Sequence, residues 1–181
     1  MALEHRKMNS LYIRDGHESD RDAIQDVTLS AYQQYAAVLP PTHWESYRRN
    51  ILDTLADVRP AEQIVAEQNG AVVGAVLLYP AGTVFSGLDG ASITLAWPEV
   101  RLLAVAPATR GQGIGKALMQ ECVRRAQQSG SAAITLHTSD MMEVAMHMYE
   151  RMGFVRTPEF DFQPAPGVTI KGYRLSLDGT I

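Results

Sequence analysis

The sequence contains a single cysteine, Cys122, among its 181 residues, so the chain cannot form an internal disulfide. It also lacks an apolar run of the roughly 18 residues that a membrane-spanning helix needs. Its most apolar stretch, Ala71 to Tyr79, is only as long as a strand. The segment from Met1 to Ser10 carries basic residues with no apolar block behind them, so we expect no signal peptide. These absences predict a cytoplasmic protein without membrane contact.

Positive charge is also scarce. The chain has 16 Lys and Arg residues against 20 Asp and Glu residues, which gives a net charge of -4. Nucleic-acid-binding proteins usually carry a basic stripe, and none is visible here. Mild acidity instead favours a cationic partner over an anionic one. No Cys and His residues share the spacing of a zinc site, so we expect no metal.

The length and composition are those of an ordinary globular protein. Hydrophobic residues make up 46% of the chain and charged residues 20%. A chain of this size can bury one sizeable core but is short for two. We therefore expect a single domain over residues 1–181, with its folded core at about residues 11–177.

Hydrophobic periodicity and chain breakers predict alternating strands and helices. We expect strands at 11–14, 63–67, 71–79, 93–96, 99–105, 132–137, 154–156 and 168–175. Apolar stripes predict two helices around residues 23–31 and 44–55, and two more at 113–128 and 143–152. Helices before and after a central hairpin indicate a mixed sheet covered by helices.

The segment from Arg110 to Lys116 reads RGQGIGK and lies between an expected strand and an expected helix. The first turn of a helix has unpaired backbone N–H groups and the positive end of the helix dipole. Glycines let an anion approach those groups closely, and the flanking Arg110 and Lys116 add positive charge. The segment therefore predicts a site for a pyrophosphate or a similar anion.

Two common phosphate loops do not fit this segment. A P-loop needs Ser or Thr after its Gly-Lys pair, whereas Ala117 follows Gly115-Lys116. The dinucleotide-binding fingerprint needs a third glycine where this chain has Lys116, and it belongs near the first strand of its fold. What remains is Arg-Gly-x-Gly-x-Gly after a strongly apolar strand.

In this segment the chain resembles the GNAT N-acetyltransferase superfamily, which carries Gln/Arg-x-x-Gly-x-Gly/Ala at a strand–helix junction. Arg110, Gly113 and Gly115 match that motif. A Gly-rich turn without a ligand is the alternative interpretation. In the resembled family the motif holds the pyrophosphate of coenzyme A.

A second family motif lies in the last expected helix. The family usually carries Asn-x-x-Ala-x-x-x-Tyr-x-x-x-Gly-Phe there, and this chain has Ala145, Tyr149, Gly153 and Phe154 in the same register. Met142 stands in the Asn position, which removes one expected polar contact to the cofactor. Two motifs in the right order are more specific than either one alone.

The resemblance implies an α+β fold with three α/β layers, in which a mixed, mostly antiparallel central sheet is flanked by helices. It also implies acetyl-CoA as co-substrate, with the pantetheine arm lying along the strand around Leu103 and a backbone N–H near Leu103 or Ala104 as oxyanion donor. The residues expected to bind the cofactor are Leu103, Ala104, Val105, Arg110, Gly111, Gln112, Gly113, Ile114, Gly115 and Lys116.

Acetyl transfer to an amine needs a proton acceptor, because a free amine is mostly protonated at neutral pH. It also needs a proton donor for the departing thiolate. Tyr149 matches the family's acid position, although it could instead be a core aromatic. Glu99 begins the cofactor strand and is the candidate base, although it could instead be a solvated carboxylate. As a base it would need a pKa raised by partial burial.

The leading hypothesis is an N-acetyltransferase that acts by direct attack in a ternary complex, since no well-placed Cys or Ser nucleophile is present. The acceptor is a small-molecule or peptide amine, for which an aromatic set with one carboxylate is a plausible wall. Its members are Tyr32, Tyr35, Trp44, Glu45, Tyr47, Phe85 and Trp97. A non-catalytic acyl-CoA sensor and a different nucleotide enzyme stay as alternatives, and a homodimer is left open.

Overall fold

The computed structural model describes residues 10–86, 90–165 and 167–178. The expectation about a signal peptide at residues 1–10 therefore lies almost entirely outside the described residues. The strands are β1 (Leu11–Asp15), β2 (Glu62–Gln68), β3 (Ala71–Tyr79), β4 (Val84–Ser86), β5 (Ser92–Thr94), β6 (Glu99–Val105), β7 (Ala133–Thr138), β8 (Val155–Arg156), β9 (Phe162–Ala165) and β10 (Val168–Ser176).

Helices and short 3-10 turns connect these strands. The α-helices are α1 (Arg21–Tyr32), α2 (Pro41–Ala56), α3 (Ile114–Gln128) and α4 (Glu143–Arg151). The 3-10 turns are η1 (Glu18–Asp20), η2 (Gln33–Ala37), η3 (Pro107–Thr109), η4 (Asp140–Met142) and η5 (Pro158–Phe160). Among the described residues, no helix combines the length and the apolar character needed to cross a membrane.

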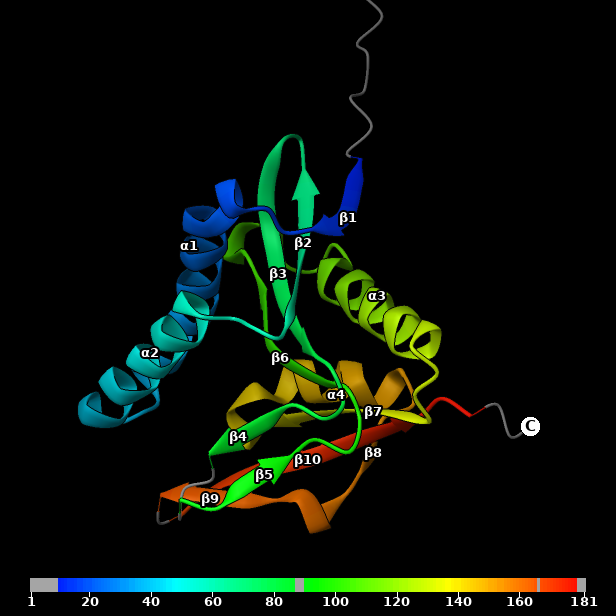
Figure 1. The fold of residues 1–181 in the computed structure, drawn as a ribbon. Helices are drawn as coiled ribbons and strands as arrows, with labels where there is room; N and C mark the ends of the chain where they lie inside the picture. The colour runs from blue at the N-terminus through cyan, green and yellow to red at the C-terminus, as the bar shows by residue number, and fades with distance from the viewer. Residues whose placement is uncertain (1–9, 87–89, 166, 179–181) are drawn as a thin grey trace, which may run out of the picture.

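The main sheet has the strand order β1-β2-β3-β6-β7-β10-β8, with β9 also paired to β10. Every pair in it is antiparallel except β6 and β7, which are parallel. The expectation of a mixed, mostly antiparallel sheet is confirmed. β4 and β5 form a separate hairpin, which lies in front of the lower strands in Figure 1.

Helices cover both faces of the sheet. Successive strand side chains point to opposite faces, so each face carries apolar residues that the helices bury. On one face, Val65, Ala75 and Ala104 pack with the apolar sides of α1 and α2. On the other face, residues such as Val76 and Ile134 pack with α3 and α4. Figure 1 shows α1 and α2 on the left of the sheet and α3 on the right. The site described below lies between these layers.

The pairing between β6 and β7 is brief. Its register consists of Glu99 opposite Thr135 and Val100 opposite Leu136. In Figure 1 the strands from β1 to β6 run steeply, whereas β7 and β10 run almost horizontally, so the two halves of the sheet turn away from each other at this junction. Within the described part of the chain, the edge of β6 from Arg101 to Val105 is therefore left without a strand partner on the β7 side.

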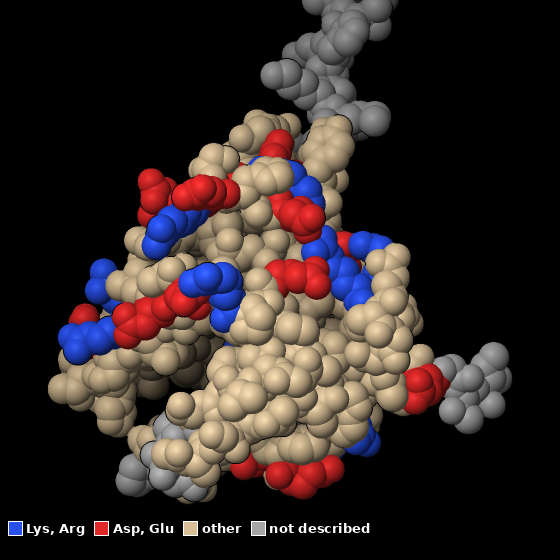
Figure 2. Space-filling view, viewed as in Figure 1, with Lys and Arg blue, Asp and Glu red and all other residues tan. Residues whose placement is uncertain are grey.

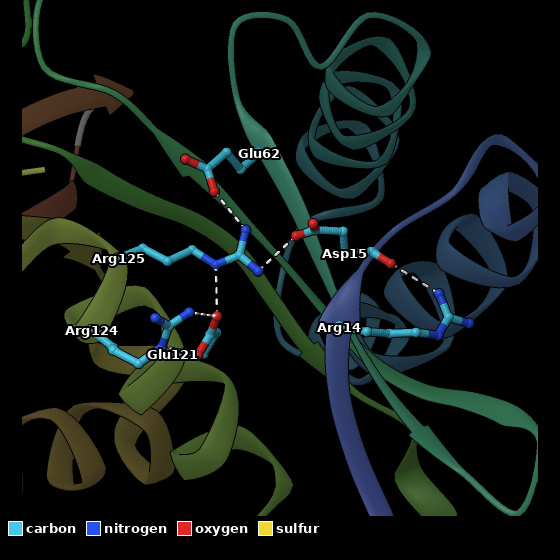
Figure 3. Close-up of polar contacts among 6 residues, drawn as sticks. All are labelled: Arg14, Asp15, Glu62, Glu121, Arg124 and Arg125. Atoms are coloured by element: carbon cyan, nitrogen blue, oxygen red, sulfur yellow. Dashed lines mark hydrogen bonds and ion pairs between the residues drawn. The ribbon is translucent and has the colours of Figure 1, made fainter. Parts of the chain in front are cut away.

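Arg125 holds α3 against the first two strands. Its guanidinium lies 2.6 Å from Asp15 of β1, 2.6 Å from Glu62 of β2 and 2.8 Å from Glu121 of α3 itself (Figure 3). The Arg125 side chain is only 17% exposed, and partly buried ion pairs are screened by salt less than exposed ones. This network fixes the position of α3, whose N-terminus forms part of the site.

Candidate active site

Six consecutive backbone amides lie at the start of α3 and in the turn before it. Gly111 and Gly113 have φ angles of 77° and 80°, which L-residues with side chains rarely adopt. Gly113 is the N-cap of α3. Across this part of the described chain, the amides from Gly111 to Lys116 donate no hydrogen bond within the protein. Such a row of free N–H groups at a helix N-terminus is suited to bind an anion.

The side chains around this turn shape it in different ways. Ile114 is buried in the core and anchors the helix start. A Cβ atom on Gly115 would lie 3.6 Å from Met148 Sδ of α4 and 3.6 Å from Val105 Cγ2. Gln112 accepts a hydrogen bond from Gln68 at 3.2 Å, and Lys116 is exposed. The turn is therefore bordered by β6 on one side and by α4 on the other.

Arg110 contacts other parts of the protein, whereas the sequence predicted that it would add its charge to the anion site. Its guanidinium donates hydrogen bonds to the carbonyl oxygen of Ala31 at 2.9 Å and to Gln34 Oε1 at 3.1 Å. The side chain thus ties the turn to the C-terminal end of α1. Arg110 adds positive charge near the anion site that the free amides form, but its hydrogen bonds go to α1 and η2.

The free edge of β6 continues directly from this turn. Between Arg101 and Ala104 the pairing with β3 shifts register, and Leu102 has a φ of 51°. A bulge of this kind re-aims backbone groups away from the regular ladder. Leu103, Ala104 and Val105 therefore lie on a strand edge that faces the opening between β6 and β7.

Tyr149 reaches this opening from α4. It is 7% exposed, and its ring centroid lies 6.0 Å from that of Phe154. Burial first, and then the nearby phenol of Tyr35, raise the pKa of Tyr149 well above its usual value of 10. The phenol therefore stays protonated throughout the neutral range and can act as a proton donor.

The aromatic residues of the expected acceptor wall separate into two groups. Tyr32 lies 5.8 Å from both Tyr35 and Tyr47, and Trp44 lies 6.4 Å from Tyr47, measured between ring centroids. Burial raises the pKa of Tyr32 and Tyr47, and Tyr149 contributes to both shifts. The phenols of Tyr32, Tyr35 and Tyr47 therefore lie near enough to Tyr149 for their charges to affect one another's pKa. Tyr32, Tyr35, Trp44 and Tyr47 thus form one aromatic group from α1, η2 and α2.

Phe85 and Trp97 lie elsewhere, and each stacks on an arginine. The Arg101 guanidinium carbon is 3.8 Å from the centroid of Phe85, and that of Arg174 is 5.2 Å from the centroid of Trp97. Glu45 is exposed on α2. Figure 2 shows the surface hollowed between α2 and the β4–β5 hairpin, to which Phe85 belongs.

Glu99 is the buried carboxylate of the site, with only 3% of its surface exposed. It accepts a hydrogen bond from Arg101 Nε at 2.7 Å. His137 Nδ1 lies 3.3 Å from its second oxygen, and His137 Nε2 lies 3.0 Å from the carbonyl oxygen of Phe160. Since both ring nitrogens face acceptors, this geometry favours the doubly protonated imidazolium.

The pKa values of Glu99 and His137 move apart. Burial raises the pKa of Glu99, but His137 and Arg101 together outweigh burial and bring it below its usual value of 4.5. Burial lowers the pKa of His137, but Glu99 and the Phe160 carbonyl raise it above its usual value of 6.5. The expected burial of Glu99 is present, yet the net shift is opposite to the one that a base was expected to need.

The candidate base and acid approach the opening from opposite faces of the sheet. Glu99 pairs with Tyr79 of β3, and directly opposed strand residues point to the same face. On that face Leu77 and Tyr79 pack with Phe85 of the β4–β5 hairpin. Tyr149 packs in the core of the other face. A molecule held in the opening could therefore meet a carboxylate on one side and a phenol on the other.

The arrangement matches a known family. The model of the Acetyltransferase (GNAT) family matches residues 23–154, which include β6, the turn before α3, and Tyr149. This chain belongs to the GNAT acetyltransferase family. The resemblance inferred from the two sequence motifs is confirmed.

Individual relatives cover only part of this GNAT chain or share little sequence with it. Mouse N-acetyltransferase 8B is 30% identical over 64% of this chain and 47% of its own length. The mycothiol acetyltransferase of Cellulomonas flavigena is 30% identical over 54% of this chain and 28% of its own length. The chain thus spans less than half the length of either relative. A GNAT family acetyltransferase from Brucella melitensis, solved with acetyl-CoA, superposes with a TM-score of 0.62 over 94% of this chain and 90% of its own, at 22% identity.

The position where other GNAT sequences carry Asn is occupied by an apolar contact. Met142 lies in η4 and packs against the cluster that α1 and α2 form with the sheet. Nearby, the hydroxyl of Ser139 is buried without a hydrogen-bond partner among the described residues. Cys122 is buried in the core, which raises the pKa of its thiol to about 12 and leaves it unsuited to act as a nucleophile.

Two polar residues of this GNAT site were not singled out from the sequence as site residues. Arg101 follows Glu99 by two residues on the same strand, so strand periodicity alone could have placed both on one face. His137 comes from β7, and its contact with Glu99 depends on the parallel register of two strands. No local pattern reveals that register. Within the described residues, no group of three or more His, Cys, Asp or Glu side chains is arranged to hold a metal.

Proposed function

We propose that this chain is an acetyl-CoA-dependent N-acetyltransferase, which transfers an acetyl group to a primary amine by direct attack in a ternary complex. The observation that carries the proposal is the row of free amides from Gly111 to Lys116, continuous with the unpaired edge of β6. Family membership and the acetyl-CoA bound in the Brucella melitensis structure support the same co-substrate.

The residues of the site fit that co-substrate. The free amides and the dipole of α3 would bind its pyrophosphate, and Arg110 and Lys116 would add positive charge. The edge from Leu103 to Val105 would pair with the amide groups of the pantetheine arm, as one strand pairs with another. A backbone N–H at Leu103 or Ala104 would stabilise the oxyanion that forms on the thioester carbonyl. Bound there, acetyl-CoA supplies the activated acyl group.

Two side chains would move protons in this reaction. Glu99, ionised at neutral pH, would attract the acceptor ammonium and take up its proton, directly or through a water. Tyr149 would give a proton to the departing thiolate, because a thiol with an ordinary pKa of about 8.5 is mostly protonated at neutral pH. The nitrogen of the new amide would release its remaining proton, which would return Tyr149 to the neutral phenol through water. Since Cys122 is buried, the amine would attack the thioester without a covalent enzyme intermediate.

The test is a measurement of free CoA release with a thiol reagent, in the presence of acetyl-CoA and a panel of primary amines. The proposal expects release above the rate of background hydrolysis with at least one amine, and an acetylated product of matching mass. Acetyl-CoA binding without any turnover would instead favour the non-catalytic acyl-CoA sensor. Absence of acetyl-CoA binding would contradict both.

A further inference from the structure

Arg101 contacts Glu99 and two aromatic rings but uses only part of its hydrogen-bonding capacity. Its Nε donates to Glu99 at 2.7 Å. Its guanidinium stacks on Phe85 at 3.8 Å and lies 5.5 Å from the ring centroid of Tyr79. Among the residues that the structure describes, its two Nη groups donate no hydrogen bond and join no ion pair. The fork formed by these two groups is therefore free to bind a second carboxylate.

The position of this fork connects it to the acceptor side of the site. Arg101 lies on β6 immediately before the bulge at Leu102. Its side chain is 39% exposed, whereas Glu99 beneath it is almost fully buried. Phe85, on which it stacks, belongs to the β4–β5 hairpin, and the surface is hollowed between that hairpin and α2 (Figure 2). A molecule entering from this side would meet Arg101 before it met Glu99.

A carboxylate and a guanidinium in direct contact form the complement of a zwitterion. An α-amino acid carries its ammonium and its carboxylate on one carbon atom, so the two charges are as close together as those of Glu99 and Arg101. If the ammonium group of the amino acid faced Glu99, its carboxylate would lie beside the two free Nη groups of Arg101. Opposite charges arranged in this way also set the orientation of the ligand.

We propose that the acceptor is an amino acid, whose carboxylate is bound by Arg101 and whose amine is presented to Glu99. This inference rests on the proposed acetyltransferase function and names the substrate class of the same site. Polyamines and lysine side chains fit less well, because they would bring positive charge to Arg101 without an anion to bind it. The overall acidity of the chain favoured a cationic acceptor, but the charges at the site favour a zwitterion.

The experiment compares matched sets of three acceptors by CoA release. Each set consists of an amino acid, its carboxamide and its decarboxylated amine, for example phenylalanine, phenylalaninamide and phenethylamine. One charge-assisted interaction should make kcat/KM about 10- to 100-fold higher for the amino acid than for the other two. Equal or better use of the carboxamide or the amine would overturn the inference.

Arginine variants locate the effect. In Arg101→Gln the preference for the carboxylate should disappear, mainly through a higher KM for the amino acid, and Arg101→Lys should restore part of it. Arg174→Gln is the matched control, because Arg174 also stacks on an aromatic ring and points to the same sheet face from β10, two strands away from Glu99. A preference that survives in Arg101→Gln, or is lost equally in Arg174→Gln, would overturn the inference.

Binding measurements separate this inference from the function on which it rests. Calorimetry with CoA-saturated protein should detect the amino acid and not its carboxamide, whether or not turnover occurs. If acetyl-CoA binds and only amines without a carboxylate are acetylated, the substrate class is wrong and the acetyltransferase function stands. If neither acetyl-CoA nor CoA binds, the proposed function itself fails.

Discussion

Glu99 illustrates how neighbouring charges decide what a buried carboxylate can do. Its burial alone would favour the neutral form, but two cationic groups contact its two oxygens. It therefore stays ionised at any pH above its usual pKa of about 4.5. An ionised carboxylate attracts an ammonium group strongly, although it is a weaker proton acceptor than a carboxylate with a raised pKa.

The pairing of His137 with Glu99 should make protein stability depend on pH. Because folding raises the pKa of His137 above 6.5, the pair stabilises the fold fully below pH 6.5 and loses this effect as the pH rises through the folded-state pKa. His137→Gln should therefore lower the free energy of unfolding by about 1–3 kcal/mol more at pH 6 than at pH 9. Urea unfolding at the two pH values measures the difference.

His147 provides the control for this prediction. It lies exposed on α4, so His147→Gln removes an imidazole without removing a contact with Glu99. An equal loss of stability at pH 6 and pH 9 in His137→Gln would mean that His137 is not an ionised partner of Glu99.

Tyr149 is predicted to act in turnover rather than in cofactor binding. Tyr149→Phe removes the phenolic proton and leaves the buried ring in place, so kcat should fall on the order of 100-fold. The dissociation constant for acetyl-CoA should change by less than about two-fold, since the free amides of α3 are untouched. Steady-state kinetics and calorimetry on the same preparation measure both quantities.

Tyr173→Phe is the matched control for this variant. Tyr173 is also buried, and its hydroxyl donates to Glu150 at 3.1 Å on the surface side of α4. Its loss should affect stability and leave kcat nearly unchanged. If Tyr149→Phe weakens acetyl-CoA binding as much as it slows turnover, Tyr149 is a binding or packing residue.

Single residues could be predicted from the sequence where a motif or a periodicity includes them. Tyr149 and Gly113 lie in motif register, and the burial of Cys122 follows from the apolar stripe of its helix. The contact between His137 and Glu99 could not be predicted in this way, because 38 positions along the chain separate the two residues. It exists only once β6 and β7 pair in parallel.

At the scale of elements, the start of α3 carries most of the proposed cofactor binding. Gly113 has a φ of 80°, and a Cβ atom added there would have no other atom within 4 Å. Gly113→Ala should therefore lower stability by about 1 kcal/mol through backbone strain alone. It should also weaken acetyl-CoA binding by about 10-fold or more, since it shifts the amides around the anion.

Gly70→Ala separates backbone strain from binding. Gly70 also has a φ of 80° and open space around it, but it lies in the turn between β2 and β3. The two variants should lose similar stability in thermal unfolding, and only Gly113→Ala should lose affinity in calorimetry. Equal affinity in both variants would contradict a cofactor site at this turn.

Long, strongly patterned elements could be predicted almost to their ends. β3 and β6 have the expected boundaries, and β2 and β3 form the expected central hairpin. β4 and β9 were not expected. They are only three and four residues long, and both are largely exposed. Short exposed strands have no buried face, so their sequences lack the alternation of apolar and polar residues that predicts a strand.

At the scale of the whole molecule, the fold is a sheet in two halves that meet at one short parallel junction. In the described part of the chain, only two residue pairs register β6 against β7, and the helices of both faces meet around the resulting opening. A ligand that lies along β6 and contacts α3 and α4 would link the halves. Binding to the native state alone stabilises that state by mass action.

Acetyl-CoA should therefore raise the thermal stability of the protein. At a concentration 100 times its dissociation constant, it should add about 2.7 kcal/mol to the free energy of unfolding. For a chain of this size the midpoint of thermal unfolding should rise by about 5–10 °C. Differential scanning calorimetry with and without acetyl-CoA measures the shift, and Gly113→Ala at the same ligand concentration should show a smaller one.

The most direct test of the whole account is a calorimetric titration of acetyl-CoA into the purified protein. The account predicts micromolar binding at one site per chain, and weaker binding to Gly113→Ala than to Gly70→Ala. Absence of binding to the unmodified chain would contradict the proposal that the amides of α3 and the open edge of β6 form a site for acetyl-CoA.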